Sequence, residues 1–372
     1  MPHHNRQDGP EVLGSAVVVG ASLAGLMSAL TLSRIGLQVT MLERSARKVR
    51  TGAALPVSDG LLERLTGRRT HGRTAGIPSG GQAWADVHAA LGSAVRDDPN
   101  ISLRSPVRVT DVGQDDGSAW VVTEDGEQVQ GDIVVGADGH ASVVRRRVVP
   151  DAPDATFSGY LIWLGLVDEA DIVSRPWHSD LAILYERDYC LNAYYLPGAD
   201  GSRARGERRL GWGWYDSGRN DLLRSSGAVE GNIVQRTLRA PDVPDATFDE
   251  LAKEAQEIWP DPWREAIVDC ITRRDVIGTP IGEYMPSQLT AGRVCLVGDA
   301  AHLPSPMTGS GFSASAEDAL ALADALADTV DRPDGFAAGL TRYGAVRLDA
   351  ARSLVRSGQS FNRSFAPRGA AQ

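Results

Sequence analysis

The sequence predicts an α/β fold in which a Rossmann-like nucleotide-binding domain is interrupted by an antiparallel β-sheet. Residues 15–43 read as a buried strand, a helix with regular apolar spacing and a second strand. Residues 158–215 contain four aromatic segments separated by turn residues, a pattern typical of antiparallel strands. From residue 293 a buried strand and an alanine-rich helix follow. We therefore expect a nucleotide-binding domain that is discontinuous in sequence, with the sheet inserted between its halves and helices at the C-terminus.

The individual elements follow from apolar periodicity and from turn residues. In the first half we expect strands at 16–19 and 37–42, helices at 23–35, 61–65 and 84–95, and further strands within 101–136. In the inserted part we expect strands at 158–167, 181–186, 189–196 and 208–215, then helices at 221–238, 248–258 and 263–271. The last part is expected to hold a strand at 293–297 and helices at 312–328 and 336–355.

Composition narrows the classes of partner. The 372 residues are 42% hydrophobic and 23% charged, which is ordinary for a globular protein. The net charge of −10 argues against nucleic acid or an anionic membrane as the main partner, but not against a nucleotide held by oriented amides. No stretch approaches 18 uninterrupted apolar residues, so no membrane span is expected.

The three cysteines, Cys190, Cys270 and Cys295, are an odd number without metal-ligand spacing. We expect buried, reduced thiols in a cytoplasmic protein. Residues 1–11 are polar and lack the apolar stretch of a signal peptide. No constellation of residues predicts a metal site.

The first motif, Gly20-Ala-Ser-Leu-Ala-Gly25, leaves a predicted strand and opens a predicted helix. Gly20 permits the tight turn and Gly25 lets helix and strand pack closely, while the helix N-terminus offers free N–H groups to a pyrophosphate. Ser22 replaces the usual middle glycine. Glu43 ends the second strand, where its carboxylate can accept hydrogen bonds from ribose hydroxyls and would repel a 2′-phosphate. This leaves FAD or NAD as the dinucleotide.

Two further motifs specify the family. They are Asp132-Ile-Val-Val-Gly-Ala-Asp138-Gly139 with Arg145 behind it, and Gly298-Asp299-Ala-Ala-His302 followed by Pro306-Met-Thr-Gly-Ser-Gly311. With the first motif they resemble, in order and rough spacing, the single-component FAD-dependent aromatic hydroxylases of the p-hydroxybenzoate hydroxylase fold. The similarity covers residues 14–328. The stretches around Trp84, 159–172 and 206–216 look most similar to the 2,6-dihydroxypyridine 3-hydroxylase branch.

The resemblance implies noncovalent FAD, with Asp299 on the ribityl chain and the 312–328 helix facing the flavin pyrimidine. It also implies a flavin-side arginine at Arg50. The expected cofactor-binding residues are Gly20, Ser22, Leu23, Ala24, Gly25, Glu43, Arg44, Arg50, Asp138, Gly139, Arg145, Asp299, Pro306, Gly309, Ser310, Gly311 and Phe312. Departures from the family pattern are Trp84 in place of a helix-opening arginine, and Ser310 and Ser313 in place of glutamine and asparagine.

The inserted sheet is expected to roof the flavin and to bind the substrate. Its alternating aromatic and polar side chains suit a planar hydroxylated ring. The candidate substrate-binding residues are Tyr185, Asn192, Tyr194, Trp212, Trp214 and Pro306. For proton transfer the candidates are Tyr194, Tyr185 and His302, of which His302 is the more readily explained as a structural residue of the flavin loop.

By resemblance, the expected activity is hydroxylation of a phenolic or hydroxypyridine-type ring, with NADPH or NADH as transient electron donor and O2 activated as a flavin C4a-hydroperoxide. A flavin halogenase is disfavoured because the chain has only Lys48 and Lys253 and lacks a WxWxIP motif. An NAD-dependent dehydrogenase leaves residues 298–311 unexplained. A reductase or a non-catalytic FAD-binding protein on the same fold stays open. The protein is expected to be a monomer or homodimer.

The expected domain organisation follows from these motifs. The parts are the first part of the FAD-binding domain at 12–157, the substrate-binding sheet with helices at 158–282, the second part of the FAD-binding domain at 283–330, and a C-terminal helix and tail at 331–372.

Overall fold

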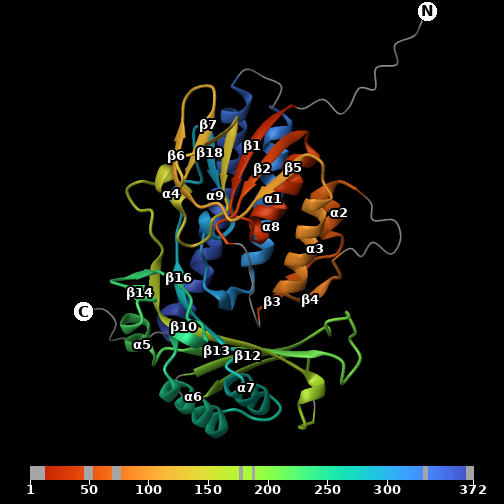
Figure 1. Cartoon of the computed structure of the whole chain (residues 1–372), viewed down its shortest axis with the longest axis vertical. Coiled ribbons are helices and arrows are strands. Elements are labelled where there is room, and N and C mark those ends of the chain that lie inside the picture. The colour runs from red at the N-terminus through yellow and green to blue at the C-terminus, as the bar shows by residue number, and fades with distance from the viewer. Residues whose placement is uncertain are drawn as a thin grey trace, which may run out of the picture.

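The computed structural model describes residues 13–45, 53–68, 77–175, 179–186, 189–329 and 334–365. They form two layers, each built on its own β-sheet (Figure 1). Segments from both ends of the chain build the upper layer in the view of Figure 1, and the middle of the chain builds the lower one. The predicted α/β fold with a discontinuous nucleotide-binding domain is thereby confirmed.

The upper sheet has six strands, and all neighbours are parallel except β17 and β18. Its central strands are apolar runs because helices or other strands cover both faces. In spatial order the strands are β17 (Thr290–Ala291), β18 (Val294–Leu296), β9 (Ile133–Gly136), β1 (Gly14–Val19), β2 (Leu37–Leu42) and β5 (Ile101–Arg104).

Helices and two small sheets cover this core. Helix α1 (Leu23–Arg34) packs between α3 (Trp84–Arg96) and α8 (Gly311–Ala327). The remaining helices here are α2 (Leu61–Thr66) and α4 (Val143–Val148). The small sheets are β3 (Ala54–Val57) with β4 (Gly80–Ala83), and β6 (Val109–Gln114) with β7 (Ala119–Thr123) and β8 (Gln128–Gly131).

The lower sheet has seven strands. They are β11 (Leu181–Glu186), β12 (Tyr189–Leu196), β13 (Arg209–Asp216), β10 (Thr156–Asp168), β15 (Ile233–Val234) and β14 (Val229–Glu230), with β16 (Ile277–Glu283) also paired to β10. Helices α6 (Asp245–Ile258) and α7 (Trp263–Thr272) cover the face that points away from the upper layer (Figure 1). The domain boundaries expected at 158 and 282 fall two residues after the start of β10 and one residue before the end of β16.

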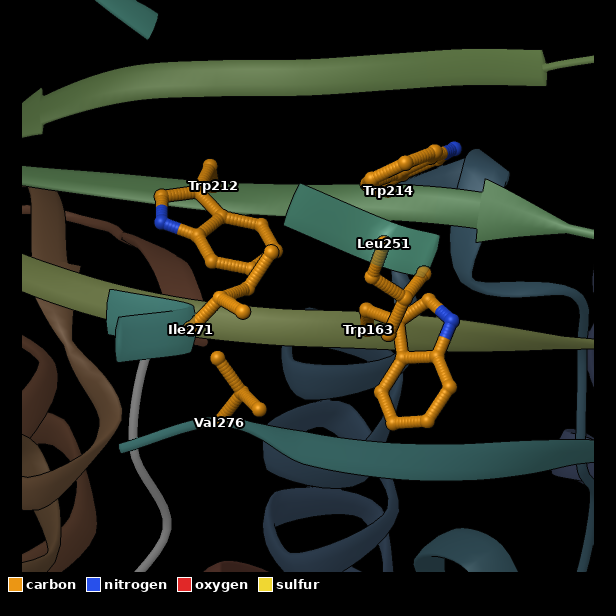
Figure 2. A pocket seen from close by; sticks show the side chains of 6 residues that line it. All are labelled: Trp163, Trp212, Trp214, Leu251, Ile271 and Val276. Carbon is orange, nitrogen blue, oxygen red and sulfur yellow. The ribbon is translucent and has the colours of Figure 1, made fainter. Parts of the chain in front are cut away.

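Alternation along the strands divides the side chains of the lower sheet between its two faces. On β12, Leu191, Ala193 and Tyr195 belong to the apolar core shared with α6 and α7, whereas Asn192 and Tyr194 point to the opposite face. The helix-covered face also contains three tryptophans (Figure 2), and the gap between them is too small for a water molecule. The lining side chains are Trp163, Trp212, Trp214, Leu251, Ile271 and Val276.

Two expected helices differ from the structure. The helix expected at 221–238 is wrong: only α5 (Asn220–Ser225) forms there, before the short strands β14 and β15. Gly227 and Gly231 have positive φ angles of 68° and 58°, which end the helix and turn the chain. The C-terminal helix, α9 (Gly335–Phe365), extends ten residues beyond the expected end at 355.

Candidate active site

The three sequence motifs meet at one edge of the upper sheet. Gly20 follows β1, Asp138 lies two residues after β9, and Gly298 lies two residues after β18. These strands are neighbours and parallel, so their carboxyl ends lie side by side. Open α/β sheets bind their ligands outside this edge.

The glycines of these motifs leave no room for side chains. Gly20 has a φ of +100°, and a Cβ there would lie 2.4 Å from the Ala137 carbonyl oxygen. A Cβ on Gly25 would lie 1.9 Å from the carbonyl oxygen of Gly20. Backbone therefore packs directly on backbone where β1 enters α1, as a cradle for a pyrophosphate requires.

The N-terminus of α1 is the anion-binding end of this cradle. Its N-cap residue Ser22 makes no capping hydrogen bond through its side chain, and Leu23, Ala24 and Gly25 form the first turn. Their N–H groups have no partner within the helix, and the helix dipole is positive at this end. The side-chain oxygen of Ser22 and these amides together suit a phosphate.

Glu43 holds the loop from the side of β2. Its side chain is buried, and its two carboxylate oxygens accept hydrogen bonds from the N–H groups of Ala21, at 2.7 Å, and Ser45, at 2.9 Å. A carboxylate oxygen accepts more than one hydrogen bond, so the group can also receive a ribose hydroxyl. Arg44 is exposed, and Arg50 lies outside the described residues.

His88 on α3 is a contact that the sequence did not indicate. Its Nε2 lies 3.0 Å from the Ala21 carbonyl oxygen, and its ring stacks on Trp84 with centroids 4.6 Å apart. Trp84, which occupies the position of the helix-opening arginine, thereby supports a residue that fixes the nucleotide loop. In the sequence, Trp84 and His88 are four residues apart, a spacing that places two side chains on the same face of a helix.

Asp138 and Asp299 differ in what their carboxylates do. Asp138 binds the start of α4, accepting hydrogen bonds from the hydroxyl of the N-cap residue Ser142 and from the N–H of Val143, at 2.7 Å. Asp299 is half-buried, and no hydrogen bond or ion pair within the described ranges holds its carboxylate. Asp299 is therefore the carboxylate placed to accept from a ligand, while Gly139, with a φ of +82°, offers backbone only.

Arg145, an expected cofactor ligand, is buried and bonded to backbone carbonyls in the structure. Its side chain is 1% exposed, and its guanidinium donates to backbone carbonyls, including that of Ala300 at 3.1 Å. It also donates to the carbonyls of His140 and Pro153 and stacks over Tyr284 at 4.1 Å. Arg145 thus ties the second motif to the third by holding their backbones.

His302 is also directed away from the site, into a buried charged cluster. Its Nε2 lies 2.7 Å from Asp318, whose other oxygen accepts from Arg347 at 2.8 Å. Asp318 also accepts the Gly298 N–H at 3.0 Å. Burial lowers the pKa of His302, but the attraction of Asp318 outweighs it and raises the pKa above its usual value. Through Asp318, His302 is therefore tied to the backbone of the loop that contains Asp299.

The loop after the third motif leads into α8. Pro306 is exposed, Gly309 has a φ of +60°, and Ser310 is the N-cap of the helix. The first N–H groups of α8, on Gly311 and Phe312, have no intrahelical partner and point back toward the site. This is a second helix N-terminus beside that of α1, which packs against α8.

One face of the lower sheet closes the site. Asn192 on β12 donates through Nδ2 to the Tyr215 hydroxyl at 3.3 Å and to the Met307 sulfur at 3.5 Å, so the sheet touches the Pro306 loop. The ring of Tyr194 lies across Gly211, where a Cβ would be 2.3 Å from it, and its hydroxyl hydrogen-bonds the Ala54 backbone. Burial raises the pKa of both Tyr194 and Tyr215, so both keep their protons at neutral pH.

Trp212 and Trp214, expected at the substrate site, lie on the other face of the lower sheet from Asn192. Both are fully buried on the opposite face, against α6 and α7 (Figure 2). Successive side chains of a strand point to opposite faces, so the face on which Trp212 and Trp214 lie depends on the register in which β13 pairs with β12. Tyr185, on β11, points to the correct face but is 61% exposed and is four residues along the strand from Leu181, the partner of Tyr194.

An aromatic wall not indicated by the sequence completes the closed side. Tyr160 and Tyr215 pack edge-on against Phe361 and Phe365 of α9, with centroids 5.1–6.2 Å apart across the group. The Tyr160 hydroxyl donates to Asn362 at 2.7 Å. These residues are far apart in sequence, and only the extension of α9 past residue 355 brings them together.

Other classes of site are not seen in the described part of the chain. The three cysteines are buried and free, and no group of three or more potential ligands is arranged to hold a metal. Within the same residues, none of the helices combines the length and hydropathy needed to cross a bilayer.

Two adjacent helix N-termini, a glycine cradle, a carboxylate at the ribose position and an uncommitted Asp299 fit FAD, and this fold and site define a flavoprotein with a roofed substrate face. The chain belongs to the FAD binding domain family, which it matches over residues 14–118 and 84–358. The predicted family and FAD cofactor are confirmed.

Relatives agree with this membership. The 2,6-dihydroxypyridine 3-monooxygenase of Paenarthrobacter nicotinovorans is 24% identical over 329 residues, covering 82% of this chain and 81% of the relative. The aurachin C monooxygenase/isomerase of Stigmatella aurantiaca is 26% identical over 375 residues, covering 92% of this chain and 87% of the relative. The structure of 2,6-dihydroxypyridine-3-hydroxylase from Arthrobacter nicotinovorans has the same fold, with a TM-score of 0.74 at 19% identity over 97% of this chain and 96% of that one. The chain is an FAD-dependent monooxygenase of the aromatic hydroxylase class.

Proposed function

We propose that the enzyme hydroxylates a phenolic or hydroxypyridine-type ring, with NADH or NADPH as electron donor and O2 as the source of the inserted oxygen. The observation that carries the substrate class is the face formed by Asn192, Tyr194 and Tyr215 opposite the Pro306 loop. It combines flat apolar surface with a few polar groups, as sites for planar hydroxylated rings do. FAD, when bound, accepts electrons from the nicotinamide and activates O2.

The residues of this chain orient the ring. The two N–H groups of the Asn192 amide donate to Tyr215 and Met307, so its Oδ1 is the atom that can accept from a ring hydroxyl or ring N–H, and the Tyr215 hydroxyl, 3.3 Å from the amide nitrogen, can donate to the ring. Because Tyr194 and Tyr215 hold their protons, they serve as hydrogen-bond donors and not as bases. A hydroxyl on the ring is thus held by donors, which favour its partly ionised, electron-rich form.

The same residues exclude water. The aromatic wall of Tyr160, Tyr215, Phe361 and Phe365 closes the side toward α9, and the small β3–β4 sheet closes the side at Tyr194 through Ala54. A closed, low-dielectric site protects reactive intermediates from water and strengthens polar contacts to the ring.

The test uses the FAD-loaded enzyme, NADH or NADPH, and a panel of phenols and hydroxypyridines under ¹⁸O₂. We expect one labelled oxygen in the product ring and accelerated nicotinamide oxidation. Unlabelled product would refute oxygen insertion from O2. Nicotinamide oxidation that no ring accelerates would favour a reductase, and retention of FAD without any turnover would favour a non-catalytic flavoprotein.

A further inference from the structure

The flavin-facing side of the lower sheet continues into an exposed apolar stripe on β11. Leu181, Ile183 and Tyr185 are 56%, 49% and 61% exposed, although large apolar side chains are normally buried. They alternate with Ala182 and Leu184, which pack toward the helices beneath the sheet, so all three project from the same face. Among the described residues, β11 is the only helix or strand with three exposed large hydrophobic side chains.

Register joins the stripe to the proposed ring site. Leu181 pairs with Tyr194, Ile183 with Asn192 and Tyr185 with Cys190. Directly paired residues on antiparallel strands have Cβ atoms about 4.5–5.5 Å apart and point to the same face. A ring held by Asn192 therefore has Ile183 as its immediate neighbour on the outer side.

The chemistry along the stripe is apolar. The side chains at Leu181 and Ile183 have no polar atoms, and Tyr185 presents a ring. At about 3.4 Å per residue, the four steps from Leu181 to Tyr185 extend about 14 Å along the strand. β11 is the outermost strand of its sheet, so the stripe lies at the edge of the ring site and not beneath it.

We propose that the substrate ring carries an apolar substituent, an alkyl chain or a second ring, which lies across Ile183 and Leu181 or Tyr185 while Asn192 holds the hydroxylated ring. This inference rests on the proposed function. Burying the substituent removes both its own surface and that of the stripe from water. Each methylene buried in this way strengthens binding about fourfold.

The test titrates FAD-loaded enzyme, without NADH or NADPH, with 4-alkylphenols and 5-alkyl-2-hydroxypyridines from methyl to hexyl. Binding is followed through the visible absorption of the flavin. For the wild type we expect Kd to fall about two- to fourfold per methylene. In the double variant Leu181→Thr/Ile183→Thr this dependence should disappear, while the Kd of the methyl compounds changes less than threefold.

The matched control is Ile233→Thr, the same substitution at a partly exposed position on β15 of the same sheet, and it should retain the dependence on chain length. If the parent rings bind but Kd does not respond to chain length, or responds equally in the double variant, the inference fails and the proposed function stands. If no ring perturbs the flavin at any length, both fail. A wild-type dimer that the double variant turns into a monomer would assign the stripe to a second copy and overturn the inference.

Discussion

The two sheets of the molecule hold their functional groups in different ways. In the upper sheet these groups follow the ends of parallel strands, so chain order and strand adjacency bring Gly20, Asp138 and Asp299 to one edge. In the lower sheet they lie within antiparallel strands, where a shift of one residue would exchange Asn192 for Leu191. A site at strand ends tolerates small errors of register, whereas a site on a strand face does not.

The largest effect is expected from Asp318, which supports the upper-sheet site from behind. Asp318→Ala removes the partner of buried His302 and Arg347 and the acceptor of the Gly298 N–H. Breaking such a buried pair typically costs about 3–5 kcal/mol in the free energy of unfolding. Urea unfolding of the apoprotein measures this. The control, Asp324→Ala, removes a carboxylate whose side chain is 75% exposed and should cost less than about 1 kcal/mol.

Gly25 tests the cradle itself. Gly25→Val forces a side chain into the Gly20 carbonyl and separates α1 from β1, so we expect FAD affinity to fall about a hundredfold or more. Ser22→Gly, in the same loop, removes only a hydroxyl that makes no capping bond and should retain FAD. Equilibrium dialysis with FAD compares the two. Equal losses would show that the Ser22 hydroxyl is itself a phosphate ligand.

Asp299 separates binding of the cofactor from stability of the fold. Because no hydrogen bond or ion pair in the described chain holds its carboxylate, Asp299→Ala should change urea unfolding of the apoprotein much less than Asp318→Ala does. Loss of a charge-assisted hydrogen bond to the ribityl chain should weaken FAD binding by about 1.5–3 kcal/mol. An Asp299→Ala protein that unfolds as early as Asp318→Ala would place both residues in the structural cluster.

One substitution on each face of the lower sheet tests which face binds the substrate and which face belongs to the core. Asn192→Ala should raise the Kd of a hydroxylated ring about fivefold with little change in stability, since one hydrogen bond contributes about 1 kcal/mol. Trp214→Phe should do the reverse, because its side chain is buried among α6 and α7. Flavin absorbance titration and thermal unfolding report the two quantities. A substrate affinity that falls in the Trp214→Phe variant but not in the Asn192→Ala variant would contradict this assignment of the two faces.

The smallest effect is a dependence of stability on pH. The raised pKa of His302 means that its contribution is complete below pH about 6.5 and is lost as pH rises through the higher folded-state value. Asp318 has a lowered pKa, so its contribution is lost only as the solution becomes acidic. Between pH 6 and 9 we therefore expect the free energy of unfolding to fall as pH rises. His302→Gln should flatten this part of the profile; an unchanged profile would contradict the assignment.

The parts of the site that could be predicted from the sequence are those where only one residue type fits the structure. Gly20 and Gly25 are glycines because any Cβ would meet backbone, and the structure has them there. The environment of Arg145 cannot be read from the sequence, because an arginine that donates to backbone carbonyls has the same signature as one that binds a ligand. The face of Trp214 cannot be read from it either, because aromatic residues occupy both faces of the lower sheet and hydrophobicity does not distinguish a core face from a substrate face.

Other residues depended on contacts between distant segments. His88 is defined by its approach to the Ala21 carbonyl, and Phe361 by its packing on Tyr160, two hundred residues away in sequence. The sequence predicts the helix that contains Phe361 only over residues 336–355, and the residues beyond 355 are largely polar. Several of these polar groups are used in the structure, since Asn362 and Gln359 both bind Glu283.

Helix α9 also constrains how a substrate can enter. About 46 Å long at 1.5 Å per residue, it is fastened to the upper sheet where the Tyr343 hydroxyl donates to the Leu296 carbonyl. At its other end it is fastened to the lower sheet, where Asn362 binds both Tyr160 and Glu283. The two layers therefore cannot hinge apart on that side without breaking buried hydrogen bonds. The outermost strand β11, at the far end of the lower sheet, has no hydrogen bond of this kind to α9 among the described contacts.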